Sequence, residues 1–254
     1  MIETIILILA AFATSILSAV IGMGGGITLL GIMAILIPEG YMVVALHGVI
    51  QLVSNGTRTA VYRQHLHRPI IRQFSMGIIP GLGCAALIVF GLIQYFEITS
   101  ASEFKFDFLK PLIGIYILWF LYLRKKRKLT SDSLFFWMGG LSGLVTVFIG
   151  AAGPLIAPFF IDRDLTKENI IATKAACQVM GHLGKMPIFI IFFGVDYLQQ
   201  WPVLFPLVIA VYFGTRIGKK FLGSLSADLF NKLFKIALTL IAMRLVIAEL
   251  IVLF

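Results

Sequence analysis

The chain has 254 residues, of which 59% are hydrophobic and 13% are charged, and its mean hydropathy is +1.00. Soluble domains carry about 25% charged residues, so this composition excludes an ordinary soluble domain. The net charge of +9 does not indicate a nucleic-acid partner, because the basic residues lie mostly in short connectors, where topology and lipid headgroups account for them. Long apolar runs recur along the whole chain and predict an all-α, polytopic membrane protein.

Eight apolar elements follow one another along the chain, and no connector is long enough for a separate soluble domain. Two of these elements are interrupted in the middle of their apolar run. The predicted elements are 3–37 (broken), 42–62, 70–95, 108–123, 134–160 (broken), 168–193, 201–222 and 228–253.

The first interruption is the glycine-rich stretch 22–26, which reads Gly-Met-Gly-Gly-Gly. Each glycine in a helix interior costs about 1 kcal/mol relative to alanine. Inside a membrane, such a break persists only where it is buried in protein or lines a polar cavity. A second break, Gly-Ala-Ala-Gly-Pro-Leu at 150–155, follows 128 residues after the first.

A stripe of four polar residues follows each break, and the two stripes are offset by 127 residues. The spacing i, i+4, i+8, i+11 places each stripe along one face of a helix. Matched breaks followed by matched stripes predict an internal duplication, with repeats 1–128 and 129–254. The stripes are His47, Gln51, Asn55 and Arg58 in the first repeat, and Lys174, Gln178, His182 and Lys185 in the second.

Loop charge predicts the topology, because connectors rich in Lys and Arg stay in the cytoplasm. The basic connectors are 63–72, 124–128, 163–167 and 219–220. Both flanks of the second broken element are basic, so we expect this element to enter and leave by the cytoplasmic face, and the first to do the same from outside. Each half then has one re-entrant or broken hairpin plus about three spans, so the halves are inverted and both termini lie outside. The alternative, full crossing by both broken elements, gives parallel repeats.

We expect a helix to restart after each break, at Ile27 in the first and after Gly153 in the second, with Pro154 in the first helical turn. A restart exposes unpaired N–H groups and the positive end of a helix dipole, which favour an anion, and glycine lets a ligand approach the backbone. The alternative reading is close helix packing across the glycines. The backbone part of the predicted substrate site consists of Gly24, Gly25, Gly26, Thr28, Gly153, Pro154 and Leu155.

The stripes supply the side chains of the predicted site. Gln51 and Gln178 offer donors to an oxyanion, and Arg58 and Lys185 offer positive charge within the membrane; Asn55 and His182 face the same way. Each has an ordinary alternative: a snorkelling arginine, interhelical amide bonds and a satisfied interior histidine. His47 and Lys174 are expected near the membrane interface.

The carboxylates lie at or near element ends, with Glu249 as the exception. A cation pathway or a carboxylate proton relay needs acids at mid-depth, so the basic and amidic interior indicates an anion. We find no metal-ligand spacing and no nucleophile–base set, and expect neither a cofactor nor catalysis.

The two breaks and the stripes after them resemble the TauE/SafE family, also called the toluene-sulfonate uptake permease family. The chain departs from it at Ala151-Ala152-Gly153-Pro154, which has fewer glycines than usual. The resemblance implies a transporter in the bacterial inner membrane, whose partners are lipids and a small anion such as sulfite, sulfoacetate or another organosulfonate. We expect alternating access at a midplane site, and the lack of mid-depth acids favours export. The alternatives are an anion channel, an importer of an organic acid and a membrane enzyme.

Overall fold

The computed structural model describes residues 2–97, 109–123, 131–161, 163–222 and 226–253, which contain helices and no strand. The helices confirm the predicted all-α membrane fold. The first half contains α1 (Ile2–Ile21), α2 (Gly25–Leu36), α3 (Gly40–Val61), the short η1 (Arg63–His65), α4 (Arg68–Phe96), α5 (Leu109–Leu118) and a π-helical turn, η3 (Trp119–Leu123). The second half contains α6 (Leu134–Ile149), α7 (Gly153–Ile156), α8 (Pro158–Ile161), α9 (Lys167–Phe193), α10 (Trp201–Leu222) and α11 (Ala227–Leu253).

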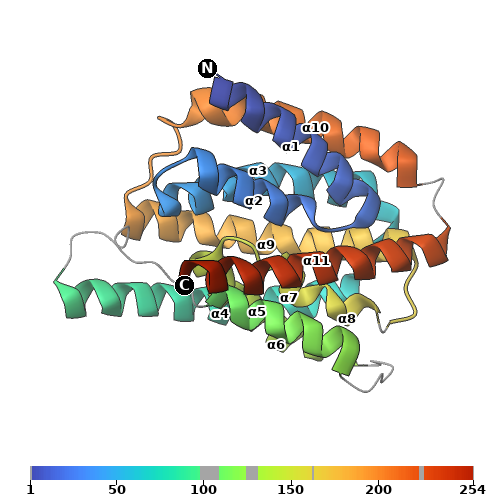
Figure 1. Cartoon of the computed structure of the whole chain (residues 1–254). Coiled ribbons are helices and arrows are strands. Elements are labelled where there is room, and N and C mark those ends of the chain that lie inside the picture. Colours follow the sequence, from blue (N-terminus) through green and yellow to red (C-terminus); the bar gives the residue numbers. More distant parts are fainter. Residues whose placement is uncertain (1, 98–108, 124–130, 162, 223–225, 254) are drawn as a thin grey trace.

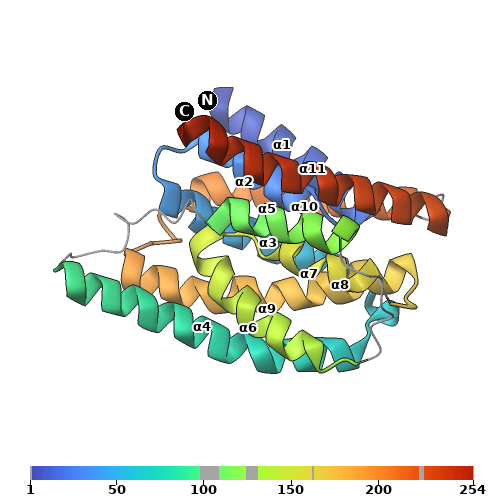
Figure 2. The ribbon, with the colours of Figure 1, turned by 60° about the horizontal axis from the view of Figure 1, so that its bottom comes forward.

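The centre of the bundle is the pair of helices that carry the polar stripes, α3 and α9, which pack against each other (Figure 1). On the α3 side lie α10 and α1, which also pack on one another, and on the α9 side lie α4 and α6. The helices α5 and α11 form a further contacting pair, as the rotated view also shows (Figure 2). The polar stripes are therefore buried in the middle of the molecule.

The outer surface of the bundle is apolar, as expected for a protein surrounded by lipid. Four of the described helices are long and apolar enough to cross a membrane, namely α1, α4, α9 and α10. Large apolar side chains project outward from them, including Ile79 and Leu87 on α4 and Ile191 on α9, each 71% exposed. Exposed apolar area on this scale is stable only against another apolar phase.

Both predicted breaks are present, and each depends on glycine at a left-handed backbone conformation. In the first break Gly22 has φ 81° and Gly24 has φ 92°, and in the second Gly150 has φ 85°. A side chain with Cβ rarely adopts such angles. The second break has one position of this kind, so Ala151 and Ala152 are tolerated there, which accounts for its lower glycine content.

The first restart differs from the predicted one in its starting residue, whereas Pro154 lies in the first turn of the second restart, as predicted. The first begins at Gly25 rather than Ile27 and continues for 12 residues. The second begins at Gly153, with Pro154 in its first turn, where proline is well tolerated. It runs as two single turns, α7 and α8, rather than as one half-helix.

The first broken element is a hairpin, because the chain reverses at the break and α2 packs back along α1. The start of α1 and the end of α2 lie at the same end of the bundle (Figure 1). The contact is tight at Gly25, where a Cβ would lie 1.8 Å from the carbonyl oxygen of Thr14. The glycine at this position thus serves helix packing, the alternative that the sequence left open.

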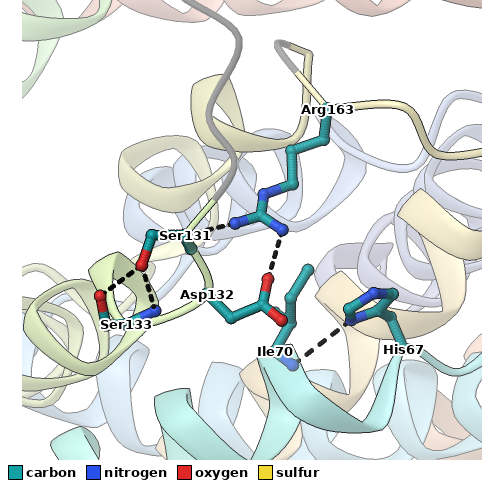
Figure 3. Close-up of polar contacts among 6 residues, drawn as sticks. All are labelled: His67, Ile70, Ser131, Asp132, Ser133 and Arg163. Atoms are coloured by element: carbon teal, nitrogen blue, oxygen red, sulfur yellow. Dashed lines mark hydrogen bonds and ion pairs between the residues drawn. The ribbon is translucent and has the colours of Figure 1, made fainter.

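The second broken element also returns to the end from which it started. Arg163, after α8, forms an ion pair with Asp132 and donates to the carbonyl oxygen of Ser131, both just before α6 (Figure 3). The same end holds the α3–α4 connector, because Asn169 Nδ2 donates to the His65 carbonyl at 2.7 Å. The basic connectors 63–72 and 163–167 therefore share one end of the bundle. Their cytoplasmic location stays a prediction.

Small residues allow the outer helices to pack at close range. On α4, a Cβ at Gly77 or Gly81 would lie 1.8 or 2.0 Å from a carbonyl oxygen of α6. On α10, a Cβ at Gly214 would lie 2.6 Å from the Phe12 carbonyl of α1. Such contacts drive helix association in lipid, where apolar burial alone does not.

We expect Gly81→Ala to destabilise the protein and Gly83→Ala to leave it intact or stabilise it slightly. The added methyl at Gly81 would overlap the Gly140 backbone, and overpacking of this kind costs about 1–3 kcal/mol. Gly83 is exposed on the same helix with nothing within 4 Å of its Cβ position, so alanine there gains about 1 kcal/mol of helix propensity. Thermal unfolding in detergent measures the stability of both variants. Equal melting temperatures would contradict the close α4–α6 contact.

Candidate functional site

A small cavity lies where the two breaks meet the two stripes. Its volume is about 30 Å³, room for roughly two water molecules. Both halves of the chain contribute to its wall. The lining residues are Ser18, Met23, Gly24, Gly26, Ile27, His47, Gln51, Arg58, Ala151, Gly153, Pro154, Lys174, Gln178 and His182.

The two glutamines of the stripes occupy matching places in the cavity wall. A Cβ at Gly26 would lie 3.0 Å from Gln51 Oε1, and a Cβ at Gly153 would lie 2.5 Å from Gln178 Nε2. Each glutamine amide thus rests on the glycine of the break in its own half. Absence of a side chain at these glycines leaves the space that the amides fill.

Two basic side chains contribute to the cavity wall, and each is anchored by a backbone carbonyl of the first half. Arg58 is 2% exposed, donates to the Ser18 carbonyl at 3.2 Å and also binds Asn55 Oδ1. Lys174 is 2% exposed and donates to the Gly22 carbonyl at 2.8 Å. The burial of Arg58 contradicts the snorkelling alternative.

Lys185 lies behind the wall of the cavity rather than in it. Its ammonium is fully buried and donates to the Gly150 carbonyl at 3.0 Å and to the Val44 carbonyl at 3.2 Å. It thereby ties the second break to the helix α3. Its charge still lies within the same low-dielectric region, where Coulomb interactions are weakly screened.

The two histidines of the cavity lie close together, with ring centroids 6.1 Å apart in an edge-on arrangement. His47 Nε2 lies 2.8 Å from the Gly26 carbonyl oxygen. Because a carbonyl accepts and cannot donate, the proton of a neutral His47 ring is on Nε2. His182 Nδ1 is buried without a hydrogen-bond partner among the described residues, which leaves it available to a ligand or a water molecule.

Several predicted site residues lie outside the cavity wall. Asn55 is fully buried and holds Arg58, while Leu155 belongs to the apolar core. Gly25 packs against α1, and Thr28 continues α2, its N–H bonded to the Gly24 carbonyl. These residues shape or support the cavity, and the predicted residues that line it are Gly24, Gly26, Gln51, Arg58, Gly153, Pro154, Gln178 and His182.

Sequence reasoning placed His47 and Lys174 near the membrane interface, and this interpretation is wrong. Both are buried and line the cavity. The signal was present, since each lies four residues before a predicted site glutamine on the same helical face. Ser18 was also missed, and nothing in the pattern of α1 distinguishes it from the neighbouring small residues.

Carboxylates do not neutralise this group of cations within the described part of the chain. The ion pairs found there, Arg163–Asp132 and Lys167–Glu168, involve other residues. No cluster of His, Cys, Asp and Glu suited to a metal occurs among the described residues. The cavity therefore combines amide donors, a helix N-terminus and uncompensated positive charge, a combination that suits a small anion.

Comparison of the sequence with protein families assigns the chain to one of them. Residues 7–245 match the family described as "Sulfite exporter TauE/SafE". The chain belongs to the TauE/SafE family. TauE/SafE proteins are membrane transporters of sulfur anions rather than enzymes, and the apolar surface and membrane-length helices of this member fit a multi-pass protein. No curated protein and no solved structure matches the chain.

Proposed function

We propose that this TauE/SafE protein exports sulfite or a small organosulfonate across the bacterial inner membrane, and that the anion binds in the cavity between the two breaks. The observation that carries the proposal is the convergence of Arg58, Lys174 and two glutamine amides on one buried cavity without a described carboxylate partner. A buried charge is costly unless paired, and an anion in the cavity supplies the partner.

The polar groups suit a tetrahedral or pyramidal sulfur oxyanion. Gln51 and Gln178 approach the cavity from opposite halves of the chain and can each donate to a different oxygen. The N–H groups of residues 25–27 open a 12-residue helix and have no acceptor earlier in that helix. The positive end of that helix adds to the field of the basic side chains.

The volume of the cavity supports a closed conformation. About 30 Å³ holds roughly two water molecules, less than a hydrated anion needs. Binding therefore requires an outward movement of the surrounding helices. We infer alternating access, with the cavity exposed to one side of the membrane at a time.

The packing of the helices supports two structurally similar halves as the basis of that movement. If α1 corresponds to α6, α3 to α9, and α4 to α10, the contact of α1 with α10 is the counterpart of the contact of α6 with α4. The central contact of α3 with α9 is its own counterpart. Such exchange is expected when two similar halves pack about a pseudo-twofold axis.

Export agrees with the energetics of an anion in a cell that is negative inside. The membrane potential favours outward movement by about 2.3 kcal/mol per charge per 100 mV. Outward transport thus needs no coupling ion, whereas uptake does. The described stripes contain no carboxylate to carry a coupling proton or cation.

Flux in proteoliposomes tests the proposal. We expect saturable, electrogenic sulfite or sulfonate efflux with counterflow, which a channel does not show. Gln51→Ala and Gln178→Ala should each raise the half-saturation concentration about 10-fold or more, because a hydrogen bond to a charged group contributes about 1.5–3 kcal/mol. Gln199→Ala, at an exposed position in the α9–α10 connector, is the control. Wild-type kinetics in both cavity variants would contradict the proposed site.

A further inference from the structure

A second cavity lies at the end of α3 and differs in character from the central one. Its volume is about 310 Å³. Three of its residues, Arg63, His65 and Lys219, are basic side chains and one, Glu168, is acidic. We call this cavity the vestibule. It is lined by Ala60, Val61, Tyr62, Arg63, Gln64, His65, Glu168, Lys219 and Leu222.

Tyr62 lines the vestibule and lies four residues after a residue of the central cavity wall. Arg58 bounds the central cavity, and Tyr62, one helical turn later on the same face, bounds the vestibule. Four residues of helix span about 6 Å, a distance that a single aromatic side chain can bridge. The Tyr62 N–H donates to the Arg58 carbonyl at 3.0 Å, the last backbone hydrogen bond of α3.

The surroundings of Tyr62 are unusual for a buried tyrosine. The side chain is 4% exposed, yet its hydroxyl has no hydrogen-bond partner among the described residues. Buried hydroxyls usually find a partner. The Lys219 ammonium lies 5.5 Å from the centre of the Tyr62 ring and donates to the Val61 carbonyl at 3.1 Å. The ring is thus held from the vestibule side, and the buried hydroxyl has a donor that none of the described residues uses.

An aromatic cluster occupies the place in the second half of the chain that corresponds to Tyr62 in the first. Phe189 lies 127 residues after Tyr62, at the matching place in the second stripe. It is 1% exposed and stacks on Phe193 with ring centroids 4.5 Å apart, and Phe193 stacks in turn on Tyr41 at 6.3 Å. Phe189 and the partly buried Tyr41, Phe193 and Tyr197 pack into a single apolar cluster.

We propose that Tyr62 is the gate between the vestibule and the central cavity, and that the vestibule collects anions before they pass it. In this proposal the Tyr62 ring closes the vestibule side of the central cavity, and the stacked rings of Phe189, Phe193 and Tyr41 close the other side. The nature of the cargo rests on the proposed function, whereas the position of the gate does not. The gate hydroxyl offers a donor to the anion during passage, and the basic vestibule raises the local anion concentration.

Thiol accessibility in membrane vesicles tests the gate. The two native cysteines, Cys84 and Cys177, are replaced by serine, and Ser18→Cys places a thiol in the wall of the central cavity. The probe is 2-sulfonatoethyl methanethiosulfonate, an impermeant anion, applied to inside-out and right-side-out vesicles in turn. We expect Tyr62→Ala to speed labelling at least 10-fold from the vestibule side, with no change from the other side.

Two further variants keep the test decisive if Tyr62→Ala folds poorly. Tyr62→Trp keeps an aromatic plug and enlarges it, so it should slow labelling, and Phe189→Ala should leave the opposite side closed because Phe193 and Tyr41 remain. Labelling that is unchanged in both Tyr62→Ala and Tyr62→Trp would overturn the gate. If the Tyr62 variants change labelling as expected but the protein transports no sulfur anion, the gate is supported and the proposed cargo is rejected.

Discussion

Lys174→Met is expected to weaken binding of a sulfur anion by about 10-fold to 100-fold. The stability of the ligand-free protein should not fall. The ammonium is 2% exposed and has one hydrogen-bond partner in the described part of the chain, the Gly22 carbonyl. A charged hydrogen bond to an anion contributes about 1.5–3 kcal/mol. In the absence of an anion the same buried charge is a cost to folding, which a neutral side chain of similar length removes.

Isothermal titration calorimetry with sulfite and with a short alkylsulfonate measures the affinity, and a thermal melt measures the stability. Lys220→Met, which removes one positive charge at an exposed position of α10, is the matched control and should bind as the wild type does. If Lys174→Met bound anions normally and melted at a lower temperature, Lys174 would be a structural residue and not part of a binding site.

Gly25→Ala and Gly26→Ala are expected to fail in different ways, although the two residues are neighbours. A Cβ at Gly25 would lie 1.8 Å from the backbone carbonyl of Thr14, so α1 and α2 must move apart. Overpacking of this kind costs about 1–3 kcal/mol and sometimes more. The three atoms nearest to a Cβ at Gly26 belong to the Gln51 amide, the closest at 3.0 Å, and a flexible side chain can move aside.

Gly25→Ala should therefore lower the melting temperature or prevent recovery of monodisperse protein. Gly26→Ala should fold, since its helical backbone accepts alanine and gains about 1 kcal/mol in propensity, but displacement of Gln51 should weaken anion binding. Size-exclusion chromatography, melting and titration separate the two outcomes. A stable Gly25→Ala protein, or a Gly26→Ala protein with wild-type affinity, would contradict the assigned roles of these glycines.

The helices, the two breaks and the innermost position of the stripes were predictable because each depends on local pattern. Apolar runs fix helix positions in a membrane, and glycine clusters mark the places where a helix cannot continue. The spacing within each stripe placed Gln51 and Gln178 each on the polar face of its own helix. Once α3 and α9 pack at the centre of the bundle, that face must be interior.

The parts that could not be predicted depend on tertiary contacts. Lys174 and Lys185 belong to one stripe, yet Lys174 lines the cavity while Lys185 bonds to the Gly150 and Val44 carbonyls behind it. Which break each lysine meets is decided by the register of α9 against α3, a long-range property. The role of Gly25 in packing, beside the role of Gly26 in the cavity, likewise depends on the approach of α1.

Arg244 on α11 packs its guanidinium against α2. A Cβ at Gly31 would lie 1.8 Å from the Arg244 guanidinium, and a Cβ at Gly24 would lie 3.9 Å from Ile241 on the same helix. Side chains of α11 therefore reach the restart of the first break. This contact joins helices that are far apart in the sequence, and no local sequence pattern predicts it.

The most direct test of the central claim is thermal stabilisation of the purified wild-type protein by a panel of solutes. The panel holds sulfite, sulfate, thiosulfate, sulfoacetate, taurine, acetate and phosphate, with choline and glycerol as a cation and a neutral solute. A ligand at 100 times its Kd stabilises the folded state by about 2.7 kcal/mol. An anion site between the breaks predicts a rise in melting temperature with sulfite or a sulfonate and none with choline or glycerol. A rise with choline or glycerol alone, or with no solute at all, would contradict it.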